Sequence, residues 1–275
     1  MEAPREGCRA PILDEALLAH ERLCQAGTCG ADDLKILDEA AAFLASCHAQ
    51  RQEAAAQQVE TQDRAVPKGG RRARQAKAKP KRWIFPVAGM KPELSMGGPE
   101  GRGYLKNRRV TCYATERAGH PAHDLFIHDV RQSTLGADGY PFEALSVEPG
   151  IVLAARSGWT PEDPGRGGNY VLVYLPLRRW VAYYAHLDRL AVAPGDVLEA
   201  GAPLGTVGRT GVNAWQKRSP THLHFAVWDT AHGWKPVDPY ELLRGARVAR
   251  RAAASSASTS KDSLAKDGPA GPSSP

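Results

Sequence analysis

Two histidines lie one residue apart at the head of an apolar run, THLHFAVWD, at residues 221–229. Successive side chains of a β-strand alternate between its two faces, so His222 and His224 would point to the same side. The opposite side, facing a core, would receive Leu223, Phe225 and Val227. The pattern therefore predicts a half-buried strand that presents two imidazoles, although two solvated surface histidines would give the same local sequence.

Two further stretches place histidines where they could act together with this pair. In GHPAHD, His120 precedes Asp124 by four residues, and in YYAHL, His186 ends an alternating run. Strand alternation predicts one face made of Trp180, Ala182, Tyr184 and His186, and a second face made of Val181, Tyr183, Ala185 and Leu187. By itself His186 would be a structural histidine at a strand end, so its interest depends on the other two motifs.

The three stretches together could build a hydrolytic zinc site. Such a site needs three protein ligands and an open fourth position, and imidazole nitrogen and carboxylate oxygen both suit zinc. His120 and Asp124 could supply two ligands, and one histidine of the 221–229 run the third. The other histidine of that run would then lie beside the metal. The sequence contains no HExxH motif, so the general base must be another group, for which histidine is well tuned near neutral pH.

The composition is that of a soluble protein with a real core. The chain has 275 residues, enough for one or two domains, of which 42% are hydrophobic and 24% charged. No apolar run is long enough to cross a bilayer. The first residues carry charges throughout and lack an apolar segment, so no transmembrane segment and no signal peptide are expected.

The character of the chain changes three times along its length. Apolar residues recur at helical spacing in the first part, which predicts an α-helical N-terminal region over residues 1–66, arranged as a hairpin with a turn at 27–30. Its expected apolar positions are Ile12, Leu13, Leu17, Leu18, Leu34, Leu37, Ala41 and Leu44. Residues 67–82 hold many basic side chains, no acid and no large aliphatic side chain, and are expected to be a disordered linker. Residues 249–275 are expected to be a disordered tail.

Residues 83–248 are predicted to form a mainly β domain. Short β-rich runs separated by Gly and Pro are typical of an antiparallel sheet or sandwich with tight turns. The runs are FEALSV, IVLAARSG, NYVLVYL, WVAYYAHL, GAPLGTVG and HLHFAVWD. The glycines among them are assigned to turns and bulges rather than to chemistry.

The five cysteines do not form a recognisable metal or redox motif. Cys8, Cys24, Cys29 and Cys47 lie in the first fifty residues, and Cys112 stands apart. Their spacings fit neither a zinc ribbon nor a redox pair. Disulfide bridges within the N-terminal region and plain buried thiols both remain open.

The order of the three histidine motifs resembles that of the lysostaphin/LytM-type zinc endopeptidases, which cut peptidoglycan cross-bridges. HPAHD, YYAHL and THLHF follow one another as in that family, PGDVLEAGAPLGTVGRTG resembles its Gly-rich stretch, and GNYVLVYL resembles the strand before its hairpin. The resemblance covers about residues 83–245. It implies a mainly β catalytic domain with an antiparallel, sandwich-like sheet.

The resemblance also implies a role for each motif residue. It assigns His120, Asp124 and His224 as ligands of Zn²⁺, and His186 and His222 as the catalytic pair that does not bind metal. One position departs from the family pattern, since Ala122 stands where the family commonly has a small residue such as glycine. Three nearby side chains stay open as alternative ligands, namely His123, His128 and Asp129.

The function implied is a zinc-dependent endopeptidase that hydrolyses peptide cross-links of bacterial peptidoglycan. Its partners would be peptidoglycan peptide stems and cross-bridges, and its place the cell envelope, periplasm or exterior, despite the missing signal peptide. The basic linker 67–82 could tether the chain to a polyanionic cell-wall polymer. Some relatives have lost ligands and act as non-catalytic regulators, whereas this chain keeps all five positions. A nucleic-acid binder is disfavoured because the basic run lacks interleaved aromatic residues.

Overall fold

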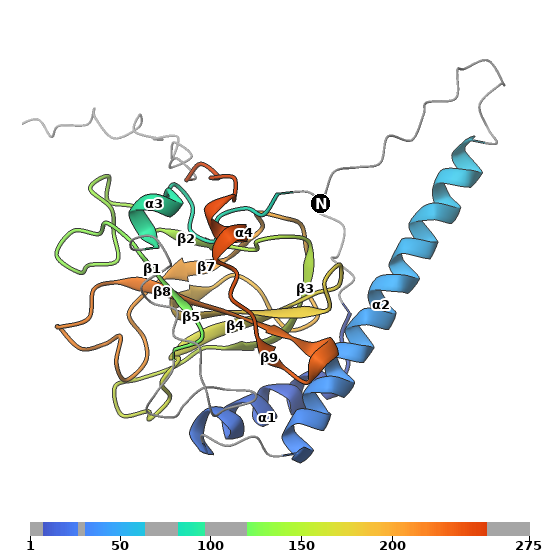
Figure 1. Ribbon diagram of the computed structural model, residues 1–275, viewed down its shortest axis with the longest axis horizontal. Coiled ribbons are helices and arrows are strands. Elements are labelled where there is room, and N and C mark those ends of the chain that lie inside the picture. The colour runs from blue at the N-terminus through green and yellow to red at the C-terminus, as the bar shows by residue number, and fades with distance from the viewer. Residues whose placement is uncertain (1–7, 27–30, 64–81, 97–119, 252–275) are drawn as a thin grey trace, which may run out of the picture.

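The computed structural model describes residues 8–26, 31–63, 82–96 and 120–251 (Figure 1). Two helices come first, α1 (Ile12–Ala26) and α2 (Ala31–Asp63), as predicted for the N-terminal region. The turn predicted at 27–30 lies outside the described residues. So do all but the last residue of the predicted linker 67–82 and most of the predicted tail 249–275.

The β region folds into one antiparallel sheet, so the predicted mainly β class is confirmed. The longer strands are β1 (His123–Phe126), β3 (Gly150–Arg156), β4 (Asn169–Leu175), β5 (Trp180–Leu190), β7 (Pro203–Val207) and β8 (His222–Asp229). The shorter strands are β2 (Glu143–Leu145), β6 (Val197–Leu198) and β9 (Lys235–Pro236). Strands β1, β8, β5, β4, β3 and β6 are neighbours in that order, while β7 pairs with β2 and β5, and β9 with β8. Three short helices complete the described part, α3 (Pro92–Ser95), η1 (Thr230–His232) and α4 (Tyr240–Arg244).

The sheet is covered on both faces. On one face, Leu172 of β4 and Trp228 of β8 share a core cluster with Leu13 of α1 and Leu37 of α2. On the other face, side chains of β4, β5 and β8 pack with the chain segment from Trp83 and with α4. A strand covered on both faces reads as a continuous apolar run, and every residue of β4 is buried.

The prediction of a half-buried strand at residues 221–229 was therefore wrong in one respect. Leu223, Phe225 and Val227 do enter one core cluster. The opposite face is covered as well, because Ala226 and Trp228 enter the cluster to which the N-terminal helices contribute.

Three of the four apolar positions expected in helix α1 face the core, since Leu13 is buried and Ile12 and Leu17 pack against the same cluster. Leu18, expected on the apolar side, is 57% exposed. The fully buried residues are Leu13, Ala16, Ala19, His20 and Leu23, which follow one another at steps of three, three, one and three. Helix α2 packs beside α1 and then runs past the sheet, with residues 49–58 exposed (Figure 1).

Three contacts at separate points fix the N-terminal region to itself and to the sheet. Cys8 and Cys47 form a disulfide, one of the alternatives left open by the sequence. The Cys8 amide donates to the Gly195 carbonyl at 2.7 Å. The indole Nε1 of Trp234 donates to Asp38 of α2 at 2.6 Å. The side chains of the other three cysteines are not among those described. The division into separate domains over residues 1–66 and 83–248 stays a prediction. The two regions share one core cluster.

The buried imidazole of His20 makes the docking of α1 sensitive to acid. His20 is fully buried beside the rings of Tyr170 and Tyr183, at 4.8 and 5.3 Å. Burial, helped by the charge of Arg156, lowers the pKa of His20 from 6.5 to about 3. The unfolded chain therefore takes up a proton as the pH falls below 6.5, while the folded chain does not, so stability is lost as the pH falls from 6.5 toward 3.

We expect the wild-type chain to lose about 2 kcal/mol more of its unfolding free energy between pH 6.5 and pH 5 than His20→Phe does. Urea unfolding of both proteins at the two pH values measures the difference. Equal losses in the two proteins would show that His20 does not titrate in this range.

Candidate metal centre

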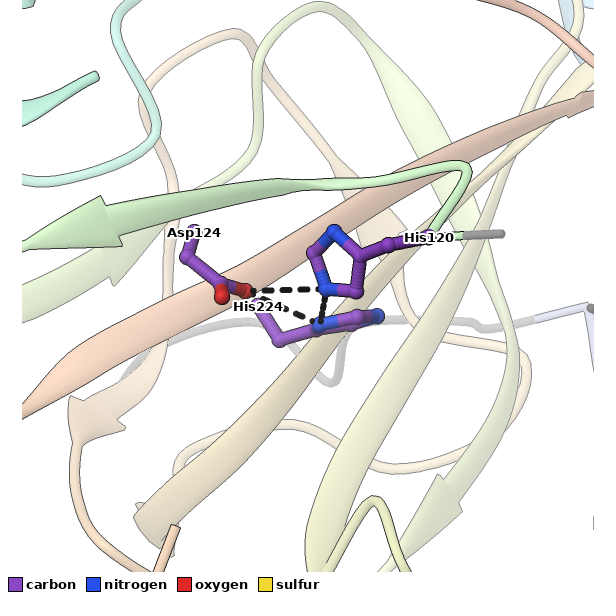
Figure 2. Close-up of side chains that lie close together, drawn as sticks. All are labelled: His120, Asp124 and His224. Carbon is purple, nitrogen blue, oxygen red and sulfur yellow. Dashed lines mark hydrogen bonds and ion pairs between the residues drawn. The ribbon is translucent and has the colours of Figure 1, made fainter. Parts of the chain in front are cut away.

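The pairing of β1 with β8 brings two of the predicted ligands face to face. In this antiparallel pair Asp124 lies directly opposite His224, and side chains that are paired in this way share a face of the sheet. His120 lies three residues before β1 and turns its ring toward the same point (Figure 2). Residues from two distant parts of the chain therefore converge because of one strand register.

The three side chains form a triangle of metal-binding size. His120 Nε2 lies 3.3 Å from His224 Nδ1 and 3.4 Å from Asp124 Oδ1, and the latter two atoms are 3.1 Å apart (Figure 2). A tetrahedral zinc ion with bonds of about 2.0–2.1 Å separates its ligand atoms by about 3.3 Å. Within the described ranges, this is the one group of His, Cys, Asp or Glu side chains placed to hold an ion. Two imidazole nitrogens and a carboxylate oxygen fit zinc by chemistry and by spacing.

The charge states of the group also suit a cation. Burial would raise the pKa of Asp124, but hydrogen bonds with His120 and His224 outweigh it and hold that pKa well below its usual range. Burial lowers the pKa of His224, although Asp124 opposes this effect. Near neutral pH the carboxylate is therefore ionised and the His224 imidazole neutral, which are the forms that bind metal.

The side chain of His186 lies at this site, although strand alternation predicts that it points to the other face of the sheet. Alternation placed it on the face of Ala182 and Tyr184, whereas its ring lies 4.9 Å from that of His222 and 5.5 Å from that of His224. The reason is a local change of backbone, because His186 has φ +65 and the pairing of β5 with β4 shifts register there. This bulge turns His186 to the side of the site and Leu187 to the opposite core, so the predicted faces were wrong for these two residues.

His186 and His222 form a second pair beside the ligand group. Nδ1 of His186 lies 2.8 Å from the Thr210 carbonyl, and Nδ1 of His222 lies 2.8 Å from the Pro220 carbonyl. A carbonyl oxygen can only accept, so both Nδ1 atoms carry the proton and donate it. In the neutral form of each imidazole, Nε2 is then the proton acceptor. Burial, and then His222 and His224, lower the pKa of His186 well below 6.5, which keeps this imidazole neutral.

The three alternative ligands lie apart from the group. His123 points to the opposite face of β1 from Asp124, where its Nε2 lies 2.8 Å from Asp238. His128 is exposed. Asp129 accepts a hydrogen bond from the Thr221 hydroxyl at 2.7 Å and so fixes the residue before His222. The structure thus brings together the five residues that the motifs singled out and leaves these three outside.

Arg209 is a residue of the site region that the motifs did not reveal. Its guanidinium donates to the carbonyls of Gln216 and Ser219 at 3.0 and 2.9 Å and to the Thr221 hydroxyl at 3.0 Å. These bonds hold the loop that leads into β8 and hence the start of the His222–His224 segment. One arginine in a basic chain carries no sequence signal for such a role.

Gly211 is expected to be required for the position of His186. It has φ +102, and a Cβ there would lie 2.3 Å from the Arg166 carbonyl oxygen and 3.0 Å from Nδ1 of His186. Gly211→Ala should therefore displace His186 and lower turnover by about tenfold or more, while the protein still binds zinc. Turnover and zinc content of the purified protein measure the two effects.

Gly233→Ala serves as the matched control, because Gly233 also has a positive φ, +75, but no atom lies within 4 Å of the added Cβ. It should lose some stability and keep its turnover. Equal turnover in the two variants would contradict the proposed crowding at His186.

The sequence of the β region matches a known family. Residues 137–239 match the family described as Peptidase family M23. This segment contains His186, His222 and His224, and it begins after His120 and Asp124. No curated protein matches the chain. In the described part of the chain, no helix is apolar over a length that would cross a membrane.

Three solved structures resemble the chain in part. The catalytic domain of the antimicrobial peptidase lysostaphin from Staphylococcus simulans is 22% identical, with 52% of this chain and 89% of that chain covered and a TM-score of 0.36. A putative glycyl-glycine endopeptidase lytM from Ruminococcus gnavus is 26% identical, with 62% of each chain covered and a TM-score of 0.42. A zinc containing peptidase from Vibrio cholerae is 24% identical, with 52% of this chain and 36% of that chain covered and a TM-score of 0.33.

The last two similarities span less than two thirds of the proteins concerned. The family match itself lies in the region that carries the Tyr-rich strand β5, the glycine stretch and the H-x-H strand β8. Residues 137–239 therefore match peptidase family M23, and the resemblance to lysostaphin/LytM-type peptidases is confirmed.

Proposed function

We propose that the chain is a zinc-dependent endopeptidase that hydrolyses peptide cross-links of bacterial peptidoglycan. The observation that carries the proposal is the metal-sized triangle of His120, Asp124 and His224, with His186 and His222 beside it. Membership of a peptidase family supports peptide-bond hydrolysis. The choice of peptidoglycan rests on the order of the three histidine motifs.

The ligand group would hold the zinc, and the second pair would handle protons. When bound, zinc would supply a Lewis acid that lowers the pKa of a water and polarises the scissile carbonyl. The Nε2 atoms of His186 and His222 carry lone pairs and can take the proton that the attacking water loses. The low pKa of His186 makes its protonated form a strong acid, so it readily gives a proton to the leaving amine.

Two backbone carbonyl groups orient the imidazoles of His186 and His222 for proton transfer. Thr210 and Pro220 accept the Nδ1 protons, which fixes each ring in one tautomer and one orientation. No rearrangement is then needed before Nε2 meets a substrate. A positioned acid or base of this kind contributes about 10²–10⁴-fold to a rate.

The complete set of five residues argues against a non-catalytic regulator. A regulator needs no ionisable pair beside a metal group, whereas here each histidine has a partner that fixes its ring. The polyanion tether proposed for the basic linker 67–82 lies outside the described residues, except for Arg82.

We also propose that the chain works outside the cytoplasm. The Cys8–Cys47 disulfide supports this, because structural disulfides form and persist in oxidising compartments such as the periplasm or the exterior. The proposed substrate lies in the same place. Thiol titration of the chain purified from the envelope fraction under denaturing conditions would find the two cysteines blocked.

Hydrolysis of purified sacculi by the full, zinc-loaded chain tests the proposed function. We expect soluble peptide fragments whose masses name the cleaved bond, and no fragments after treatment with a chelator or in His224→Ala. His232→Ala is a control, since this histidine is exposed and pairs with Asp229 away from the group. A protein that holds zinc at one ion per chain and releases no fragments would be a non-catalytic binder instead.

A further inference from the structure

A single loop carries the two carbonyl groups that fix the rings of the proposed proton-handling pair. Residues 208–221 join β7 to β8. Near its start, the Thr210 carbonyl accepts from Nδ1 of His186. Near its end, the Pro220 carbonyl accepts from Nδ1 of His222. The tautomer of each imidazole therefore depends on how its own end of the loop is anchored.

The Thr210 end is anchored to the sheet by the side chain of Thr210 itself. The Thr210 hydroxyl donates to the Leu187 carbonyl at 2.8 Å and accepts from the Asn169 amide at 2.9 Å. Leu187 belongs to β5 and Asn169 to β4, so this end is tied to two strands. The acceptor of His186 is thus held without the rest of the loop.

The Pro220 end is held by the guanidinium of Arg209. Its Nη1 donates to the Ser219 carbonyl at 2.9 Å and to the Thr221 hydroxyl at 3.0 Å, so it bonds to the residues on both sides of Pro220. Its Nη2 donates to the Gln216 carbonyl at 3.0 Å. The planar, forked guanidinium suits such a set of acceptors, and a lysine ammonium would not replace it.

The Thr221 hydroxyl extends this anchor to the segment after β1. It is buried, and besides accepting from Arg209 it donates to Oδ2 of Asp129 at 2.7 Å. Asp129 is itself held, since it accepts from the Thr134 amide at 2.9 Å. A hydroxyl between a cation and an anion is polarised in one direction, which strengthens both of its hydrogen bonds. Loss of the guanidinium breaks this chain next to Pro220.

A second side chain also holds the loop, but on one side of Pro220. Nε2 of Gln132 donates to the Lys217 carbonyl at 2.9 Å and to the Ser219 carbonyl at 3.2 Å. Gln132 is exposed, and both of its acceptors precede Pro220. Of the two side chains, it is Arg209 that bonds on both sides of the carbonyl that His222 needs.

We propose that Arg209 is a positioning residue that sets the tautomer of His222 by keeping the Pro220 carbonyl at Nδ1. The proton then stays on Nδ1, and Nε2, which lies 3.5 Å from Oδ1 of Asp124, faces the ligand group with its lone pair. An imidazole without an acceptor at Nδ1 favours the proton on Nε2 instead. That form would put a proton where the proposed reaction needs an acceptor. The effect on turnover rests on the proposed function, whereas the tautomer does not.

Nitrogen NMR spectra of the histidine rings in the full chain, with and without zinc, test the inference, because they show which ring nitrogen carries the proton. The signals are assigned from His186→Ala and His222→Ala. At about pH 8, where an ordinary imidazole is neutral, we expect both wild-type rings to carry the proton on Nδ1. Arg209→Gln should move the His222 proton to Nε2 and leave the His186 proton in place. The unchanged His186 ring also shows that the fold survives.

Two further variants separate the fork of Arg209 from its charge. Arg209→Lys keeps the positive charge without the fork and should behave like Arg209→Gln. Arg218→Gln removes an exposed arginine of the same loop and should keep both wild-type tautomers. A wild-type His222 ring in either Arg209 variant, or a shift of both histidines together, would overturn the inference.

Kinetics of the zinc-loaded chain connect the tautomer to the proposed reaction. Arg209→Gln should lower kcat by about tenfold to a hundredfold, with KM and zinc content unchanged, because a proton acceptor has been turned rather than a ligand removed. A His222 tautomer that shifts as expected, in a chain whose wild-type form cleaves no sacculi, would overturn the proposed function and support the positioning role.

Discussion

His224→Ala is expected to bind no stoichiometric zinc and to lose at least about 10³-fold in peptidase activity. His224 Nδ1 lies 3.1 Å from Asp124 and 3.3 Å from His120, so it is one corner of the ligand triangle. Two protein ligands that remain cannot hold the ion as three do. Metal analysis of the purified protein and the release of peptides from sacculi measure the two losses.

The control for this variant must show that the fold survives. His232→Ala removes an exposed imidazole that follows β8 by three residues, and it should keep both zinc and activity. The circular dichroism of His224→Ala should match that of the wild-type protein. A folded His224→Ala protein that still binds one zinc per chain would show that the ion sits elsewhere.

Strands β4 and β8 could be predicted from the sequence because their own residues favour a strand. The run NYVLVYL predicted β4 to the residue, and HLHFAVWD predicted β8 to the residue. Both runs contain valine and aromatic residues; Pro176 follows the first run, and the second ends at Asp229. Local propensity and burial favour the same structure there, and no distant contact was needed to recognise it.

The direction of the His186 side chain could not be predicted from strand alternation. A single residue with a left-handed backbone reverses the face to which the following side chains point. His186 carries φ +65, a conformation that is uncommon for residues other than glycine. The amide and carbonyl of His186 are bonded to Gly167 and Gly208, which lie on two different neighbouring segments. Such a bulge depends on tertiary partners, and the sequence of β5 alone does not show them.

The sequence also did not predict that the N-terminal helices cover the sheet face that carries the histidines, and the reason is related. Helical spacing predicted α1 and the burial of Leu13, but it did not predict that Ala16, Ala19 and His20 are also buried. The burial of a small residue against a sheet can be predicted only when the position of that sheet is known. The ion pair of Glu21 with Arg156 likewise follows from the docking of α1 and from no local pattern.

His222→Ala is expected to keep one zinc per chain and to lose about 10²–10⁴-fold in turnover, the usual contribution of a positioned acid or base. His222 lies outside the ligand triangle, and its Nδ1 proton is held by the Pro220 carbonyl, so its loss leaves the metal ligands in place. His186→Ala should behave in the same way. If the two imidazoles serve one proton path, the double variant should lose little more than either single variant.

The comparison with His224→Ala separates a loss of turnover from a general loss of the fold. His222 and His224 lie two residues apart on one strand, so damage to β8 would affect both variants alike. Zinc retained in His222→Ala and lost in His224→Ala therefore cannot come from misfolding, and it divides the histidines into a binding set and a reacting set. Metal content and steady-state turnover of the same preparations decide the point. Wild-type turnover in His222→Ala would remove this residue from the reaction, and zinc loss in His222→Ala would move it into the ligand set.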